Sequence, residues 1–318
     1  MLDRITLPPF LLLEPQYRDY VWGGQRLRPG AGITAEAWVV YEQDKVAIGI
    51  CQGQTLADLA AAHGAALLGR KSVQKTGSRF PLLIKLLDCA DWLSIQVHPN
   101  DEQAVQLEAP GVFGKTEAWH TLEADPGARV IAGVQPGVTP RALAQAIRDG
   151  TIEGMAQYLS LHRGDTLFMR PGTLHALGPG LLIYEVQQTS DLTYRVYDWG
   201  RPASENRQLH IEQSLAVTRH DARAELTPLP ELQDGKEQVL CTSDYFTLSM
   251  LSATTQPIPL DTHSESFHAL TAIDGRVRLT EGAESIDLSR FDTVLVPAST
   301  GAYQLEPLSA FKALKSTV

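Results

Sequence analysis

Cysteine is scarce in this chain, and its three residues lie far apart. Cys51, Cys89 and Cys241 form neither a CxxC pair nor the spacing of a disulfide framework. Buried, reduced thiols are therefore the expected state. The chain also lacks the ordered basic start, long apolar block and cleavage site of a secretory signal, so we expect a cytoplasmic protein.

Long apolar runs and an excess of positive charge are missing as well. No stretch approaches the roughly 20 apolar residues that a membrane helix requires. The 318 residues include 27 Lys and Arg against 37 Asp and Glu, a formal net charge of −10. A phosphate backbone or an anionic membrane surface would repel such a chain unless its basic groups gathered locally. We expect neither nucleic acid nor a membrane as a partner, and nothing implies an obligate protein partner.

Glycine-rich phosphate loops do not follow the predicted strands, whereas strand signals themselves are frequent. Short β-branched or aromatic segments alternate with Gly, Pro and Asp, which favours a sandwich or barrel over βαβ units. These segments are 37–41, 94–98, 128–134, 166–169, 182–186 and 194–197. Helical spacing and capping residues predict few helices, at 56–68, 101–107, 140–147 and 211–217.

The character of the chain changes near Asp221. The segment 226–235 contains Pro, Asp and Gly and is typical of a connector. Beyond it, alternating strands are predicted with turns at Asp274-Gly275 and Glu281-Gly282. Because single cores stop growing near roughly 250–300 residues, we predict a first domain over 1–222 and a smaller all-β domain over 236–318.

Four residues of the first domain have the types and spacing of a metal site. Gln96 and His98 are two apart on a predicted strand, so both side chains leave the same face. Glu117 lies in another β-type segment, and His175 follows the Pro171-Gly172 turn, whose glycine and histidine spacings resemble the second cupin motif. Imidazole, carboxylate and amide donors suit a borderline divalent ion, with zinc first and manganese, iron or cobalt open.

Each of these residues also has a structural explanation that spacing alone leaves open. His98 can cap the helix that follows it, and His175 can lie on a surface turn. Glu117 can form a solvated pair with Lys115, which would contribute little to stability.

Several segments resemble, in collinear order, the class I mannose-6-phosphate isomerases. Leu93-Ser-Ile-Gln-Val-His-Pro-Asn-Asp101 resembles part of that family's signature, and Lys115-Thr-Glu-Ala-Trp119 matches its Lys-x-Glu segment. Arg170-Pro-Gly-Thr-Leu-His-Ala176 resembles its third metal motif, and 184–201 is similar to its catalytic arginine region in the short bacterial form. Further similar segments are 20–24, 35–38, 80–88 and 209–212. The resemblance covers about residues 8–220.

The resemblance implies a mainly β protein of the cupin or jelly-roll class, with a metal-binding catalytic barrel over 1–222 and a cupin-like C-terminal β domain. It implies an aldose–ketose isomerase that interconverts mannose 6-phosphate and fructose 6-phosphate with Zn²⁺, one ion per chain, and no organic cofactor. The implied metal ligands are Gln96, His98, Glu117 and His175, and the implied catalytic arginine is Arg195. The chain lacks the helical insertion of the longer members, and Gly114 stands where they have a histidine.

Isomerisation moves a proton between C1 and C2 through an enediolate, so it requires a base and stabilisation of oxyanion charge. A bound metal and Arg195 would stabilise that charge, because a guanidinium stays charged and forks onto oxygens. Candidates for proton handling and ring opening are Lys115, Glu185 and Asp191. Alternatively, the two acids only orient Arg195.

The phosphosugar substrate is a dianion near neutral pH, so an acidic protein must gather basic groups at its site. Lys85 lies in the apolar segment 82–87, where a charged side chain is costly unless it is paired or functional. We expect Lys85 and Arg201 to contribute to substrate or phosphate binding and Trp22 to stack on the sugar, although core packing remains the alternative for the tryptophan.

Three other functions compete with this hypothesis. A related isomerase could act on an unphosphorylated aldose, and a non-catalytic cupin could sense a sugar. An iron-dependent cupin oxygenase is the third, although Gln96 would be an unusual ligand there.

Overall fold

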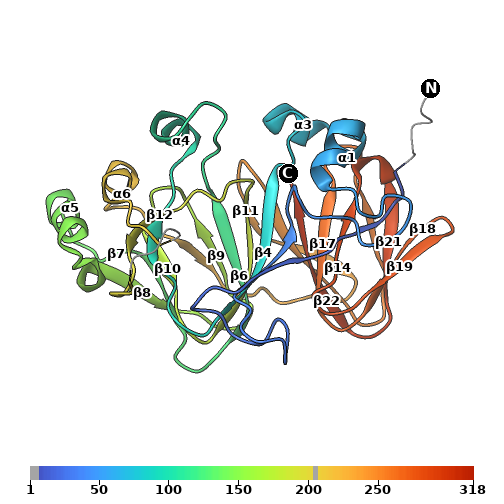
Figure 1. Ribbon diagram of the computed structural model, residues 1–318. Helices are drawn as coiled ribbons and strands as arrows, with labels where there is room; N and C mark the ends of the chain where they lie inside the picture. Colours follow the sequence, from blue (N-terminus) through green and yellow to red (C-terminus); the bar gives the residue numbers. More distant parts are fainter. Residues whose placement is uncertain (1–6, 203–206) are drawn as a thin grey trace. The chain divides into compact units, whose positions relative to one another are not determined.

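Short strands separated by turns make up most of the secondary structure (Figure 1). The computed structural model describes residues 7–202 and 207–318. The predicted mainly β class with few helices is confirmed. The chain forms two units: unit 1 contains the described residues up to Gln16, Trp38–Ile84 and Pro230–Val318, and unit 2 contains Tyr17–Ala37 and Lys85–Leu229.

This division by packing is discontinuous in sequence, because 38–84 belongs to the same unit as the C-terminal strands. The predicted boundaries, 1–222 and 236–318, follow the order of the chain instead. We keep those boundaries as a proposal about which segments make up the catalytic and the C-terminal domains.

Unit 1 contains two antiparallel sheets. The first has the order β1 (Leu11–Leu12), β20 (Thr293–Val296), β17 (His268–Asp274), β22 (Phe311–Thr317), β15 (Thr247–Ala253) and β14 (Lys236–Thr242). The second has the order β16 (Ile258–Asp261), β21 (Ala302–Pro307), β18 (Val277–Glu281) and β19 (Glu284–Leu288). Both sheets contribute side chains to one apolar cluster, which includes Leu251, Leu270, Val277, Leu279, Val294 and Leu305. Burial of this cluster is the main favourable contribution to the stability of the unit.

The described residues of unit 1 also include an N-terminal segment, three short α-helices and a 3₁₀ turn, η2 (Ala298–Thr300). In β1, Leu11 lies opposite Leu295 and is fully buried, which accounts for the apolar stretch near the start of the chain. The helix predicted over 56–68 is two helices, α1 (Leu56–His63) and α2 (Ala65–Leu68), separated by Gly64. The next helix, α3 (Arg70–Thr76), was not predicted.

Unit 2 contains a five-stranded sheet and most of a seven-stranded sheet. The five-stranded sheet has the order β12 (Tyr194–Tyr197), β5 (Ile95–Val97), β10 (His175–Leu177), β7 (Arg129–Val134) and β8 (Ala156–Ser160). The other has the order β13 (Glu225–Thr227), β9 (Thr166–Met169), β6 (Glu117–Ala124), β11 (Leu181–Gln188), β4 (Leu82–Cys89), β3 (Glu36–Val40) and β2 (Gln16–Arg18). Of β4 and β3, residues 85–89 and 36–37 belong to unit 2.

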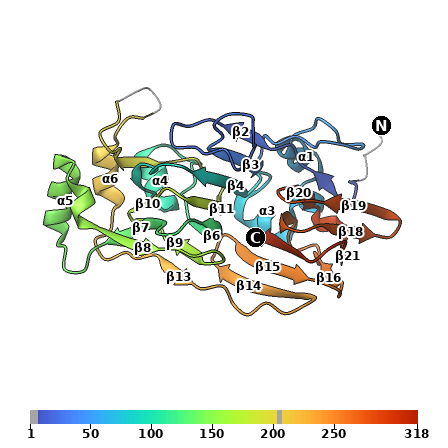
Figure 2. The same ribbon diagram turned by 90° about the horizontal axis from the view of Figure 1, so that it is seen from below.

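The helices of unit 2 begin where the sequence predicts. Asn100 caps α4 (Asp101–Leu107) in a reciprocal arrangement with Gln103, and Thr139 caps α5 (Pro140–Asp149). A 3₁₀ turn, η1 (Ile152–Met155), follows α5, and α6 (Ile211–Val217) follows β12. Figures 1 and 2 both show α5 and α6 next to each other near β7 and β8. None of the helices that the structure describes has the length and apolar character needed to span a membrane.

The two glycines at the ends of β18 differ in what surrounds them. Both have positive φ, 67° at Gly275 and 54° at Gly282, which favours glycine. A Cβ on Gly275 would collide with the carbonyl oxygen of Ala310, whereas nothing lies within 4 Å of a Cβ on Gly282. The close packing at Gly275 therefore adds a steric requirement to the conformational one.

Gly275→Ala should lower the free energy of unfolding by about 2–4 kcal/mol, since overpacking adds to the cost of a left-handed backbone. The control, Gly282→Ala, should cost only about 1 kcal/mol. Urea denaturation followed by circular dichroism measures both. Equal losses would contradict the close approach of Ala310 to this turn.

Candidate active site

Three neighbouring strands of unit 2 present polar side chains on one face. The pairing of β10 with β5 sets His175 opposite Gln96, and the pairing of β12 with β5 sets Arg195 opposite Gln96. Directly opposite residues of antiparallel strands project to the same side. His98 follows Gln96 by two residues and lies just beyond the end of β5. The register therefore places the predicted arginine in a row with two of the predicted ligands.

The larger sheet supplies the acidic side chains. In the pairing of β11 with β6, Gln187 lies opposite Glu117 and Glu185 lies opposite Trp119. Glu117 Oε1 is 3.2 Å from His175 Nε2, and Glu117 Oε2 is 3.5 Å from His98 Nε2. The two Nε2 atoms are 3.2 Å apart. Residues from both sheets thus meet at one buried point.

Both histidines are oriented by backbone carbonyl groups. His98 Nδ1 lies 2.9 Å from the oxygen of Leu192, and His175 Nδ1 lies 2.8 Å from the oxygen of Thr173. Burial lowers the pKa of His98 well below its usual value and that of His175 to about 4, so both rings are neutral. A neutral ring that donates through Nδ1 has a lone pair on Nε2. Both lone pairs therefore point to the carboxylate of Glu117.

These residues fit a divalent cation. Within residues 7–202 and 207–318, His98, Glu117 and His175 form a group whose ligand atoms lie within 4.8 Å of one another. Both carboxylate oxygens of Glu117 are buried and accept no hydrogen bond from the described residues. The amide nitrogen of Gln96 is 3.3 Å from His175 Nε2, and rotation of the amide brings its oxygen to the same place. A cation would satisfy two nitrogen lone pairs and a buried carboxylate together.

A cavity of about 610 Å³ adjoins this group. Most of the predicted catalytic and substrate-binding residues line it, together with one predicted ligand: Trp22, Lys85, Gln96, Lys115, Glu185, Asp191 and Arg195. Arg201 is absent from the described residues that line the cavity. Its guanidinium is 2.7 Å from Asp91 and 3.3 Å from Asp198, and it donates to the carbonyl of Trp92. Lys115 Nζ lies 3.1 Å from Glu117 Oε2, so it contacts the ligand group directly.

Lys85 is surrounded by carboxylates. Its Nζ is 3.5 Å from Asp191, 3.7 Å from Glu185 and 3.9 Å from Glu36. Burial by itself would lower the pKa of Lys85, but the carboxylates, Glu36 foremost, outweigh this and raise the pKa above its usual value. Trp119 Nε1 donates to Glu185 Oε2 at 2.7 Å, so the Glu185 carboxylate is held from two directions. Lys85 therefore remains a cation, and it holds these carboxylates around its ammonium group.

Arg195 is held by neutral groups. Its Nε donates to Ser94 Oγ at 3.0 Å, and one terminal nitrogen donates to the carbonyl of Gln208 at 3.1 Å. The structure places the two acids that could have oriented it, Glu185 and Asp191, at Lys85 instead. Arg195 therefore remains available to a ligand in the cavity.

Several cavity residues were not selected from the sequence. They are Tyr20, Glu36, Ser94, Arg207 and His210. Glu36 lies in one of the segments noted for its resemblance, and its acidic side chain in an otherwise apolar strand was a usable signal. Arg207 lies between two such segments and had no local signal.

Comparison with known proteins decides the family. The family model for the type I phosphomannose isomerase catalytic domain matches residues 10–115. A mannose-6-phosphate isomerase of Streptococcus mutans is 34% identical over 93% of this chain and 95% of its own length. The chain belongs to the mannose-6-phosphate isomerase family. The resemblance recognised from its motifs is thus confirmed.

Solved structures of mannose-6-phosphate isomerases agree with the fold. The Bacillus subtilis enzyme is 28% identical, with a TM-score of 0.87 over 98% of this chain and 100% of its own. A zinc-bound mannose 6-phosphate isomerase is 16% identical, with a TM-score of 0.76 over 97% of this chain and 99% of its own. At that level of identity the likeness concerns the fold alone.

The donor set predicts that the protein binds about one divalent ion per chain and that His98→Ala loses it, because a converging nitrogen is removed. Metal content after dialysis against zinc, measured by mass spectrometry, tests this. His162→Ala provides the control, since that imidazole is exposed in the same unit. Near-ultraviolet circular dichroism verifies folding. Equal zinc content in the two variants would refute the ligand assignment.

Proposed function

We propose that this member of the family interconverts mannose 6-phosphate and fructose 6-phosphate by proton transfer between C1 and C2. The observation that carries the proposal is the cavity lined by Lys115, Glu185 and Arg195, in which Lys115 Nζ also contacts Glu117 of the ligand group. Proton transfer within one sugar requires no redox cofactor, and we propose that no organic cofactor takes part.

Gln96, His98, Glu117 and His175 would hold one Zn²⁺ ion. Nitrogen and oxygen donors of this kind suit zinc, and a structural neighbour of the same fold contains it. When bound, the ion would polarise a substrate oxygen as a Lewis acid. Manganese, iron and cobalt are the alternatives that the donor set allows.

We assign the transfer between carbons to Glu185, because its carboxylate is held between Trp119 and Lys85. Glu185 removes the C2 proton of the open-chain aldose, the electron pair forms the C1–C2 double bond, and negative charge develops on the C1 oxygen. The C1 oxygen then takes up a proton. Glu185 returns its own proton to C1, and the C2 hydroxyl loses its proton, so that C2 becomes the carbonyl carbon of the ketose. Arg195 stabilises the enediolate oxygens or the phosphate as a fixed cation.

Lys115 and Asp191 complete the proton handling. Lys115 Nζ lies at the ligand group and would exchange protons with the substrate oxygens. The Asp191 side chain is 61% exposed, which allows it to pass protons to water during opening of the sugar ring. Trp22 lines the cavity and offers an apolar face to the sugar.

The phosphate of the substrate requires positive charge. Lys85 and Arg201 remain predicted contributors, although the charge of each is already shared with carboxylates. We also propose that the enzyme works in the cytoplasm without a nucleic-acid, membrane or obligate protein partner. The acidic net charge and the three free cysteines support this.

A coupled assay of purified protein tests the function. Interconversion of the two phosphosugars should be lost on chelation and restored by zinc, and Arg195→Ala should lower kcat/KM by about 10²–10³ because a preorganised cation is removed. Conversion of free mannose alone would instead indicate an isomerase of unphosphorylated aldoses. Metal binding without any conversion would indicate a sugar-sensing protein.

Trp119→Phe isolates the orientation of Glu185. The variant retains an aromatic ring near His175 but removes the indole donor, so kcat should fall about tenfold with metal content unchanged. The matched control is Trp199→Phe, which removes an indole donor to the carbonyl of Leu93 and should leave kcat near wild type. A fall in KM alone, or loss of metal, would argue against the orienting role.

A further inference from the structure

The cations that line the cavity fall into two classes. Lys115 is paired with Glu117, and Lys85 is surrounded by Glu36, Glu185 and Asp191. Arg195, in contrast, forms no ion pair with any carboxylate in the part of the chain that the structure describes, and its partners are a serine hydroxyl and a backbone carbonyl. The arginine side of the cavity therefore has uncompensated positive charge.

Arg207 adds a second guanidinium on that side. It lines the same cavity, its side chain is 15% exposed, and its Nε donates to Asp198 at 2.7 Å. One terminal nitrogen, Nη2, also donates to Asp198, so the ion pair is bidentate. The remaining nitrogen, Nη1, has no hydrogen bond to any described residue. Asp198 thus orients Arg207 without using all of its donors.

Asp198 is shared. It also accepts from Arg201, which in turn pairs with Asp91. The guanidinium groups of Arg195, Arg201 and Arg207 thus lie with two carboxylates, those of Asp91 and Asp198. The pKa of Arg195 is lowered, first by burial and second by the positive charge of Arg207. An anion bound between the two guanidiniums would relieve this repulsion.

Resting on the proposed function, we propose that Arg207, oriented by Asp198, binds the substrate phosphate beside Arg195 and sets the preference for phosphorylated over free hexose. A phosphate dianion offers oxygens to Nη1 of Arg207 and to the free edge of Arg195, a geometry that guanidinium groups favour. The Ser94 hydroxyl accepts from the guanidinium of Arg195, and His210 Nδ1 accepts from its backbone nitrogen; both residues line the same cavity.

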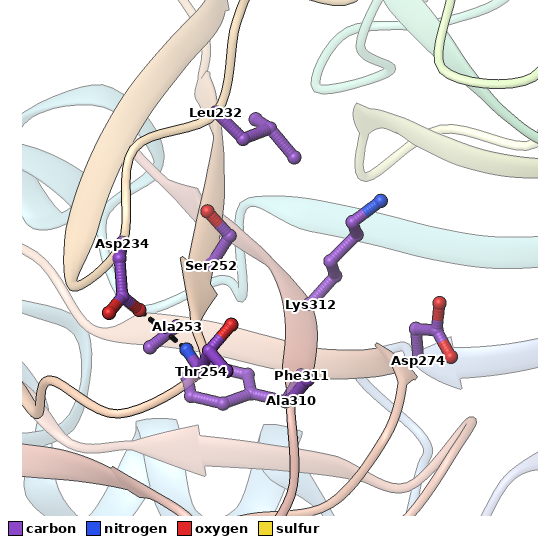
Figure 3. Close-up of a pocket in the computed structure, with 9 residues that line it drawn as sticks. All are labelled: Leu232, Asp234, Ser252, Ala253, Thr254, Asp274, Ala310, Phe311 and Lys312. Atoms are coloured by element: carbon purple, nitrogen blue, oxygen red, sulfur yellow. Dashed lines mark hydrogen bonds between the residues drawn. The ribbon is translucent and has the colours of Figure 1, made fainter.

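A second cavity, in unit 1, lacks these features (Figure 3). The carboxylate of Asp234 accepts hydrogen bonds from the backbone nitrogen of Thr254 and from the backbone and hydroxyl of Thr255. Lys312 is the cation among its described lining residues, and it lies opposite Asp274 in the pairing of β17 with β22. With two carboxylates and one lysine among its described lining residues, that cavity does not favour an anion, so we place the phosphate site in unit 2.

The test is Arg207→Gln, assayed with mannose 6-phosphate, with free mannose, and with inorganic phosphate as an inhibitor. KM for the phosphosugar and the inhibition constant for phosphate should both rise at least about tenfold, while kcat falls less than about threefold. Any turnover of free mannose should be the same in this variant and in wild type. Arg207→Lys should restore part of the affinity because the charge returns. Arg148→Gln, which removes an exposed charge from α5, should match wild type.

The proposal fails if Arg207→Gln leaves both the KM and the inhibition constant unchanged. It also fails if Arg201→Gln raises them more, since the phosphate would then be bound by Arg201. Should the wild-type protein not convert mannose 6-phosphate, phosphate-induced thermal stabilisation decides separately. Stabilisation of wild type that is absent from Arg207→Gln would keep the anion site and reject only the isomerase activity.

Discussion

The buried carboxylate of Glu117 is the constraint on which the site in unit 2 depends. It faces two imidazoles whose Nδ1 atoms are bound to backbone carbonyls, so their lone pairs point inward. Lys115 supplies one positive charge, but it leaves the two Nε2 atoms facing each other at 3.2 Å. A divalent cation satisfies the acid and both nitrogens together, whereas a slip of one residue in β6 or β10 would turn a ligand to the opposite face.

Charge is arranged unequally around the cavity. Lys85 is balanced by three acids and fixes Glu185 in place. Arg207, in contrast, shares the carboxylate of Asp198 with Arg201, and the guanidinium of Arg195 is bound by Ser94 and a backbone carbonyl. The first arrangement favours proton transfer, because a base of fixed orientation needs no reorganisation as charge moves. The second favours binding of an anion. An acidic protein with a net charge of −10 can therefore still recognise a dianion, since the relevant field is local.

Local features were predictable from the sequence and long-range ones were not. Asn100 and Thr139 cap helices as expected, and the glycines at 275 and 282 form turns, because each depends on neighbours in the chain. The strand β14, with mostly polar residues at a sheet edge, had no apolar alternation to reveal it. Glu36 had a local signal, an acid in an apolar strand, but its partner Lys85 lies in another strand. Arg207 had no local signal, and the sequence does not show that Asp198 would orient it.

The origin of the ligands ties metal binding to the packing of unit 2. Gln96, His98 and His175 come from or adjoin β5 and β10, whereas Glu117 comes from β6 in the other sheet. A cation held by all four would join the two sheets, so its binding free energy adds to the stability of this unit. The same strands orient the reacting groups, since Trp119 lies two residues beyond Glu117, packs its ring against His175 and donates to Glu185. The register of β6 against β11 therefore positions both the ligand Glu117 and the proposed base Glu185.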